Sequence, residues 1–158
     1  MKKIASFTVD HLRLLPGVYV SRRDSLKEDA LTTFDLRFTQ PNMEPVLDTA
    51  PMHAIEHLAA TYLRNDAVWG DRIIYFGPMG CRTGFYLILK GELEPQDILE
   101  LLKGMLLFIA GFTGEIPGAC AKDCGNYLDM NLPMARYHAK RYLEVLEYIT
   151  PERMRYPD

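Results

Sequence analysis

The chain contains the stretch DTAPMHAIEHLAATYLR at residues 48–64, which predicts a helix carrying two histidines one turn apart. Asp48 or Thr49 can act as the N-cap, and the proline falls where a first helical turn tolerates it. No other glycine or proline interrupts the stretch, and its apolar residues recur at helical spacing. Because residues four apart share a helix face, the spacing places His53 above His57.

This helix face predicts a catalytic metal site. Two imidazoles on one face can bind a divalent ion, and a carboxylate beside them can move protons. Glu56 lies three residues after His53 and next to His57, so its carboxylate flanks the pair. The glutamate precedes the second histidine, which is the reverse of the H-E-x-x-H order, so an inverse-zincin peptidase remains an alternative. Histidines at this spacing also occur as solvated or satisfied core residues.

Length and composition are those of one ordinary globular domain. The chain has 158 residues, of which 48% are hydrophobic and 25% charged. Its formal net charge is -3, and neither sign gathers into a long block. Arg136, Lys140 and Arg141 form a short basic face, but Glu144 and Glu147 follow on the same segment. A solvated helix surface explains this pattern better than nucleic-acid binding.

The sequence shows no segment that directs it to a membrane. Met1-Lys2-Lys3 does not lead into an apolar run long enough for a signal peptide, and residues 105–110 are too few to cross a bilayer. We therefore expect a cytoplasmic protein without a membrane partner. Three cysteines in that compartment favour metal binding or thiol reactivity over a disulfide framework.

The remaining pattern predicts an α+β fold: an antiparallel sheet with helices packed mainly on one face, in a single domain covering residues 1–158. Apolar alternation predicts strands at residues 5–9, 18–20, 34–38, 72–76 and 85–89. A second helix begins at Pro95 and a third runs from Asn131 towards Ile149. We expect residues 21–29 to form a charged loop and the tail from Thr150 to be frayed.

A third metal ligand is expected from the irregular segment at residues 120–131, because three protein ligands leave a position free for substrate. Cys124 is the first choice, since Gly125 beside it permits close approach. Cys120 competes with it, and spacing does not exclude either one. A free cysteine such as Cys124 can also be a small buried hydrophobe. A His₂Cys set would suit Fe²⁺, Zn²⁺ or Co²⁺ better than Mg²⁺ or Ca²⁺.

Cys81 is the other cysteine with chemical potential. It sits in the glycine-rich segment 77–84 between two expected strands, where a side chain can be displayed. A nearby cation, either Arg82 or the metal, would lower the pKa of the thiol and let it exchange protons near neutrality. A passive thiol in a tight turn fits the same pattern.

With these residues in place, the chain resembles the S-ribosylhomocysteine lyase (LuxS) family, whose members make the precursor of autoinducer-2. The matching pieces are short, and they share their order and spacing along most of the chain. They are Ser6-Phe7 with Asp10-His11, residues 35–38 with 40–42, residues 53–57, residues 78–84 and residues 124–127.

The resemblance implies a role for each candidate residue. His53, His57 and Cys124 would bind the metal, with Fe²⁺ as the native ion and Zn²⁺ or Co²⁺ able to substitute. Glu56 and Cys81 would be the general acid/base pair. The implied substrate contacts are Ser6, His11 and Arg37. The resemblance also implies an α+β fold and a homodimer with active sites at the subunit interface.

The implied reaction needs a Lewis acid, two proton carriers and no organic cofactor. S-ribosylhomocysteine opens its ribose ring, and its carbonyl moves from C1 to C2 and then to C3 by paired proton transfers. β-Elimination of the thioether then gives homocysteine and 4,5-dihydroxy-2,3-pentanedione. The resemblance connects these products with quorum-sensing autoinducer synthesis and with sulfur recycling in the methionine cycle, and the sequence does not distinguish the two roles.

The chain departs from the family pattern at a few positions. Tyr75 stands where many members have an aspartate, and Met130 stands where they often have a histidine. Residues 12–17 form a longer and more apolar loop than usual. A non-enzymatic alternative is a small metal-stabilised binding protein, whose site would be closed by a fourth protein ligand such as Cys120.

Overall fold

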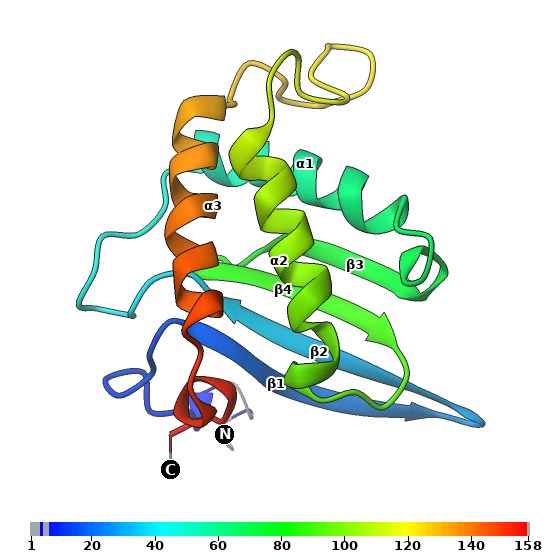
Figure 1. Ribbon diagram of the computed structural model, residues 1–158, viewed down its shortest axis with the longest axis vertical. Helices are drawn as coiled ribbons and strands as arrows, with labels where there is room; N and C mark the ends of the chain where they lie inside the picture. The colour runs from blue at the N-terminus through cyan, green and yellow to red at the C-terminus, as the bar shows by residue number, and fades with distance from the viewer. Residues whose placement is uncertain (1–3, 5–6, 158) are drawn as a thin grey trace.

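The computed structural model describes residue 4 and residues 7–157, which form a sheet with helices on one side (Figure 1). The sheet has four antiparallel strands in the order β1-β2-β4-β3. The strands are β1 (Gly17–Leu26), β2 (Asp29–Arg37), β3 (Ile73–Pro78) and β4 (Gly84–Lys90). The main helices are α1 (Thr49–Arg64), α2 (Pro95–Gly111) and α3 (Leu132–Glu147). Two short 3₁₀ helices are η2 (Gly70–Arg72) and η3 (Pro151–Met154). The α+β prediction is confirmed.

Alternation along β2 separates the core from the open face of the sheet. Phe34 and Leu36 are fully buried beneath the helices, where α2 and α3 lie in front of the sheet in Figure 1. Asp35 and Arg37 alternate with them and therefore point to the opposite face. Each fully buried aliphatic or aromatic side chain contributes about 1.5–3 kcal/mol, so this pattern fixes the register of the sheet.

The expected charged loop at residues 21–29 is wrong. β1 continues through it to Leu26, and a tight turn leads directly into β2 at Asp29. Lys27 occupies the turn with a φ of 51°, in the left-handed region that such turns require. The part of β1 from Ser21 to Leu26 carries charged side chains, including the ion-paired Arg22 and Asp24, so apolar alternation gives no sign of a strand there.

The C-terminal tail is also not frayed. η3 packs against the start of β1, where Arg153 Nη1 donates to the carbonyl of Pro16 at 3.1 Å. A Cβ at Gly17 would lie 2.2 Å from the carbonyl oxygen of Arg153, so only glycine allows this approach. The ring of Tyr156 then stacks on Tyr19 with centroids 5.0 Å apart. These contacts fix the tail beside the open face of the sheet.

The strand expected at residues 5–9 is wrong for residues 7–9, which form a turn, and residues 5 and 6 lie outside the described part.

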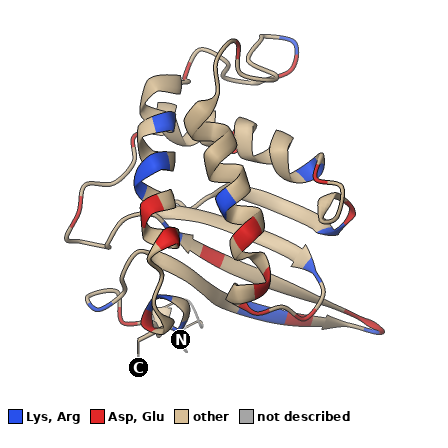
Figure 2. Cartoon of the chain, in the orientation of Figure 1, with Lys and Arg blue, Asp and Glu red and all other residues tan. Residues whose placement is uncertain are grey.

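Charges of both signs are spread over the molecule (Figure 2). The basic residues of α3 bind neighbouring elements: Arg136 Nε donates to the carbonyl of Ala110, and Arg141 pairs with Glu44. Within residues 4 and 7–157, no helix combines the length and apolarity needed to span a bilayer.

Candidate active site

The second and third turns of α1 display His53 and His57 on one face. Their ring centroids are 4.8 Å apart, with the ring planes inclined at 77°. The opposite face of the helix buries Ile55 and Leu58 completely in the core, which fixes the rotation of α1. Asp48 is the N-cap residue, but its side chain makes no capping hydrogen bond.

Two backbone carbonyls orient the imidazoles. His53 Nδ1 lies 3.0 Å from the carbonyl oxygen of Asp129, and His57 Nδ1 lies 2.8 Å from that of Pro117. A carbonyl only accepts hydrogen bonds, so in the neutral imidazoles Nδ1 carries the hydrogen and Nε2 offers its lone pair. Both Nε2 atoms are thereby prepared to bind a metal, with the second-shell support typical of histidine ligands.

Cys124 completes a group of three donors. Its Sγ lies 3.4 Å from His53 Nε2, and one ligand atom from each of Cys124, His53 and His57 lies within 4.8 Å of the others. Cys120 is outside this group, and its thiol instead lies 3.2 Å from Asp123 Oδ2. The geometry therefore favours Cys124 over Cys120 as the third donor. Two imidazoles and a thiolate fit Fe²⁺, Zn²⁺ or Co²⁺.

Glu56 and His57 line a shallow surface depression of about 350 Å³ that also includes Pro117 and Gly118. Gly118 has a φ of 72°, and a Cβ there would lie 3.3 Å from His57 Nδ1. Glycine thus lets the loop approach the histidine closely enough for the Pro117 carbonyl to reach its ring. The partly exposed Glu56 carboxylate lies next to the donor group, where it can exchange protons with a ligand entering from solvent.

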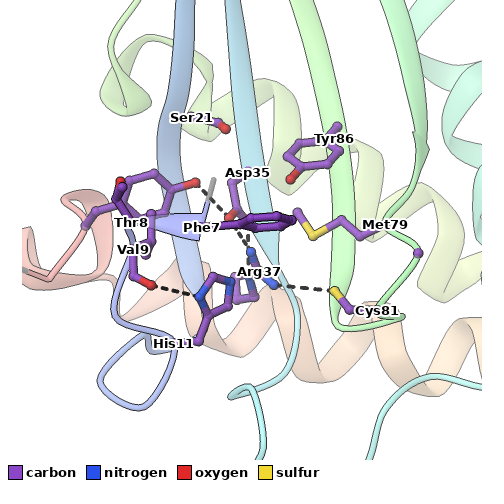
Figure 3. Close-up of a pocket in the computed structure, with 12 residues that line it drawn as sticks. Phe7, Thr8, Val9, His11, Ser21, Asp35, Arg37, Met79, Cys81 and Tyr86 are labelled. Carbon is purple, nitrogen blue, oxygen red and sulfur yellow. Dashed lines mark hydrogen bonds and ion pairs between the residues drawn. The ribbon is translucent and has the colours of Figure 1, made fainter. Parts of the chain in front are cut away.

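A second cavity, of about 450 Å³, opens on the other face of the sheet and contains Cys81 (Figure 3). Arg37 and His11 line it as well, so the structure brings together two of the predicted substrate contacts and the predicted thiol. His11 Nδ1 is held 2.9 Å from the carbonyl oxygen of Val9. Ser6, the third predicted contact, lies outside the described residues.

Arg37 forms the charged floor of this cavity. Its Nε donates to Asp35 Oδ1 at 3.1 Å and its Nη2 to Asp35 Oδ2, giving a bidentate pair that is almost fully buried. Burial acts to lower the pKa of Arg37, but the charge and hydrogen bonds of Asp35 outweigh it and raise that pKa. The remaining Nη1 donates to Thr83 Oγ1 at 2.5 Å and lies 3.9 Å from Cys81 Sγ.

The surroundings of Cys81 lower the pKa of its thiol. Burial alone would raise the pKa, but hydrogen bonds with Thr83 and the charge of Arg37 lower it further than burial raises it. Thr83 Oγ1 lies 3.1 Å from Cys81 Sγ. Arg37 is the side-chain cation that faces Cys81, whereas the expected candidate Arg82 directs its guanidinium towards Asp48, 4.0 Å away.

Three residues that the sequence did not single out support this site: Asp35 and Tyr156 line the cavity, and Thr83 hydrogen-bonds with Cys81. Asp35 alternates with Arg37 along β2, and Thr83 follows Cys81 by two residues, so strand and loop periodicity could have indicated both. Tyr156 donates to Asp35 Oδ2 at 2.8 Å from 121 residues away, and no local pattern marks it. The two residues that depart from the family pattern, Tyr75 and Met130, do not line this cavity. Tyr75 is exposed on the open face of the sheet, and Met130 packs against the core.

The candidate residues lie in two places: His57 lines the depression beside Pro117, whereas Cys81 lines the cavity on the open face of the sheet. Within the described part of the chain, the lining of the Cys81 cavity includes neither α1 histidine nor Cys124. The donor group, formed by His53, His57 and Cys124, belongs to α1 and the loop that follows α2. Cys81 instead faces the open side of the sheet (Figure 3).

Comparisons with known proteins identify the family of the chain. The family profile described as S-Ribosylhomocysteinase (LuxS) matches residues 4–152. A Clostridium acetobutylicum protein named S-ribosylhomocysteine lyase is 59% identical over 158 residues, covering all of both chains. Proteins of the same name from Clostridium beijerinckii and Finegoldia magna are 60% and 57% identical, also over all of both chains. The chain therefore belongs to the S-ribosylhomocysteinase (LuxS) family.

Proposed function

We propose that this protein is a metal-dependent S-ribosylhomocysteine lyase that releases homocysteine and 4,5-dihydroxy-2,3-pentanedione. Family membership over nearly the whole chain supports the substrate, since the full-length relatives carry that name. The observation that carries the metal dependence is the convergence of one atom each from His53, His57 and Cys124 within 4.8 Å. No other cluster of this kind was found among the described residues.

His53, His57 and Cys124 would hold the ion, which we propose to be Fe²⁺, with Zn²⁺ or Co²⁺ able to substitute. When bound, the ion would supply a Lewis acid that polarises a substrate oxygen. The hydrogen bonds from the two Nδ1 atoms hold the imidazoles in the orientation that this requires.

Cys81 and Glu56 are the proposed proton carriers. Each carbonyl shift removes a proton from one substrate carbon and returns one to its neighbour, and the elimination removes a further proton. A thiol whose pKa is held below its ordinary value can do both near neutral pH, and Arg37 and Thr83 supply that environment for Cys81. The Glu56 carboxylate, beside the donor group, would exchange protons with the oxygen atoms of the same substrate.

His11, Arg37 and Ser6 are the proposed substrate contacts. The first two place an imidazole and a guanidinium in the Cys81 cavity, where they can hydrogen-bond the hydroxyl groups of an opened sugar. We expect the hydroxyl of Ser6, in the N-terminal segment that also contains His11, to contact the same substrate.

We further propose a homodimer with active sites at the interface. One substrate must reach both Cys81 and the donor group, yet in one chain none of the three donors lines the cavity that contains Cys81. A second copy packed on the open face of the sheet would bring the two groups together. That face also exposes apolar side chains, including Phe7 and Tyr75, which are 67% and 46% exposed.

We propose that the chain acts as a single domain in the bacterial cytoplasm.

Two alternatives have less support. An inverse-zincin peptidase would place an acidic third ligand where the structure has the Cys124 thiol. A purely structural site would contain a fourth protein donor, but the group found in the described chain has three, and Cys120 pairs with Asp123 instead.

Anaerobically purified, Fe²⁺-loaded protein incubated with S-ribosylhomocysteine tests the proposal, with free thiol as the readout. The proposal expects a catalytic release of homocysteine together with a trappable α-dicarbonyl. Absence of thiol above that of a substrate-only control, from folded and metal-loaded protein, would refute it.

A further inference from the structure

We propose that Tyr156, in the C-terminal tail, is a positioning residue that sets the ionisation of Cys81 through Asp35 and Arg37. The inference rests on the proposed function, because it concerns the thiol assigned there as a proton carrier. It gives the last residues of the chain a role in the active site, which the motifs of the sequence do not suggest.

The connection is a continuous chain of contacts. Tyr156 Oη donates to Asp35 Oδ2 at 2.8 Å, and Arg37 Nη2 donates to the same oxygen. Arg37 then reaches Cys81 Sγ with its Nη1 at 3.9 Å. Tyr156 also lines the cavity that contains Cys81. Four side chains, from the tail, the sheet and the β3–β4 loop, are thus joined in one network.

The tail is held firmly enough to carry this role. Tyr156 stacks on the buried Tyr19 with an interplanar angle of 8°, and Arg153 is fixed to Pro16. Burial and the nearby charge of Asp35 raise the pKa of Tyr156, so its hydroxyl keeps its proton and remains a donor throughout the working pH range.

Electrostatics give the direction of the effect. Burial raises the pKa of Asp35, while the charge and hydrogen bonds of Arg37 favour its ionised form. The negative charge of this carboxylate cancels part of the positive field that Arg37 directs at Cys81. A hydroxyl donating to Asp35 Oδ2 neutralises part of that negative charge and keeps the carboxylate in the bidentate geometry. Removing the hydroxyl leaves Cys81 facing a weaker net positive field, and the pKa of its thiol rises.

Other ionisable groups share the cavity and stay constant in the comparison. They are Asp35 and Arg37 on β2, Tyr86 on β4 and His11 in the N-terminal segment. Burial and the charge of Asp35 raise the pKa of Tyr86, so it remains neutral where a thiol titrates. Variation at Tyr156 alone therefore isolates its contribution.

The test compares the wild type with Tyr156→Phe, which keeps the ring stacked on Tyr19 and removes only the hydroxyl. Iodoacetamide alkylation is measured from pH 6 to 10 on the free protein, and the modified peptides are quantified after tryptic digestion. Cleavage after Arg72, Arg82, Lys103, Lys122 and Arg136 puts each of the three cysteines in its own peptide, with Cys81 in residues 73–82. Tyr148→Phe is the matched control, because that side chain is 80% exposed.

We expect Tyr156→Phe to raise the alkylation pKa of Cys81 by about half a unit to one unit, while Tyr148→Phe leaves it unchanged. In turnover, the acidic limb of the kcat profile should move upward by the same amount. A Cys81 titration in Tyr156→Phe identical to wild type overturns the inference. If Tyr156→Phe fails to fold, 3-fluorotyrosine at position 156 replaces it; as a stronger donor it should lower the pKa of Cys81, and no change or a rise overturns the inference.

The alkylation readout needs neither metal nor substrate. A failed lyase assay with a shifted Cys81 pKa would therefore refute the proposed function and leave the network intact. An unshifted pKa in an active enzyme would refute the network alone.

Discussion

Cys124 Sγ lies 3.4 Å from His53 Nε2, although 71 residues separate them in the chain. Hydrogen bonds hold the loop that follows Cys124 against α1: Asn131 N donates to the carbonyl of Ala50 at 3.1 Å, and the Asp129 carbonyl reaches His53 Nδ1. The same loop that delivers the thiol thus orients the imidazole beside it. Ligand and support belong to one folded unit.

Cys124→Ala should abolish tight metal binding, because two imidazoles alone cannot reproduce a three-donor site. Co²⁺-substituted protein provides the measurement, since thiolate ligation adds a charge-transfer band in the near ultraviolet. The band should vanish in this variant. It should persist in Cys120→Ala, because the thiol of Cys120 pairs with Asp123 and lies outside the donor group. Loss of the band in Cys120→Ala instead would reverse the assignment of the third donor.

Cys81→Ala should keep the fold and one metal per chain but lose homocysteine release by about 10²–10⁴-fold, the usual contribution of a positioned acid or base. Its side chain is exposed and lies outside the donor group, so little stability depends on it. Metal analysis and circular dichroism on the same preparation separate a chemical from a structural effect. Turnover equal to wild type would remove Cys81 from the mechanism.

Thr83→Val should raise the pKa of Cys81, because it removes the hydroxyl 3.1 Å from the sulfur that favours the thiolate. Below that pKa less thiolate is present, so alkylation should slow about threefold near pH 7 and recover at high pH, when both proteins are fully ionised. The exposed Thr113→Val is the control. Wild-type reactivity in Thr83→Val would contradict the role given to this hydrogen bond.

Mixing the two inactive variants tests the shared active site. In a random mixture of Cys81→Ala and Cys124→Ala, half of the dimers are mixed, and each should hold one site with an intact thiol and an intact donor group. Activity should therefore recover to about a quarter of the wild type after subunit exchange. A mixture that stays inactive, with exchange verified by mass, would place both groups of one site in the same chain.

Much of this structure could be predicted from periodic patterns. Alternation along β2 revealed both the buried Phe34 and Leu36 and the outward direction of Arg37, because sheet burial has a period of two. The spacing of His53 and His57 predicted a shared face for the same kind of reason, and the structure confirms it. These features depend on local geometry, which the sequence displays directly.

Features that depend on contacts between distant segments were missed. The charged arm from Ser21 to Asp29 forms a hairpin through strand pairing, with no apolar face to mark it. The tail looked frayed because its anchors, Gly17 and Tyr19, lie far away in the chain. Likewise, Arg82 is next to Cys81 in sequence, but Arg37 from another strand is the cation that faces the thiol.

Metal titration of the metal-free protein tests the proposed lyase site most directly. Homocysteine release from S-ribosylhomocysteine should rise linearly as Fe²⁺ or Co²⁺ is added under anaerobic conditions. The rise should stop at one ion per chain, and Cys124→Ala should show none of it. Equal release by the metal-free and metal-loaded wild type, or full release by Cys124→Ala, would contradict the assignment of His53, His57 and Cys124 as the catalytic metal site.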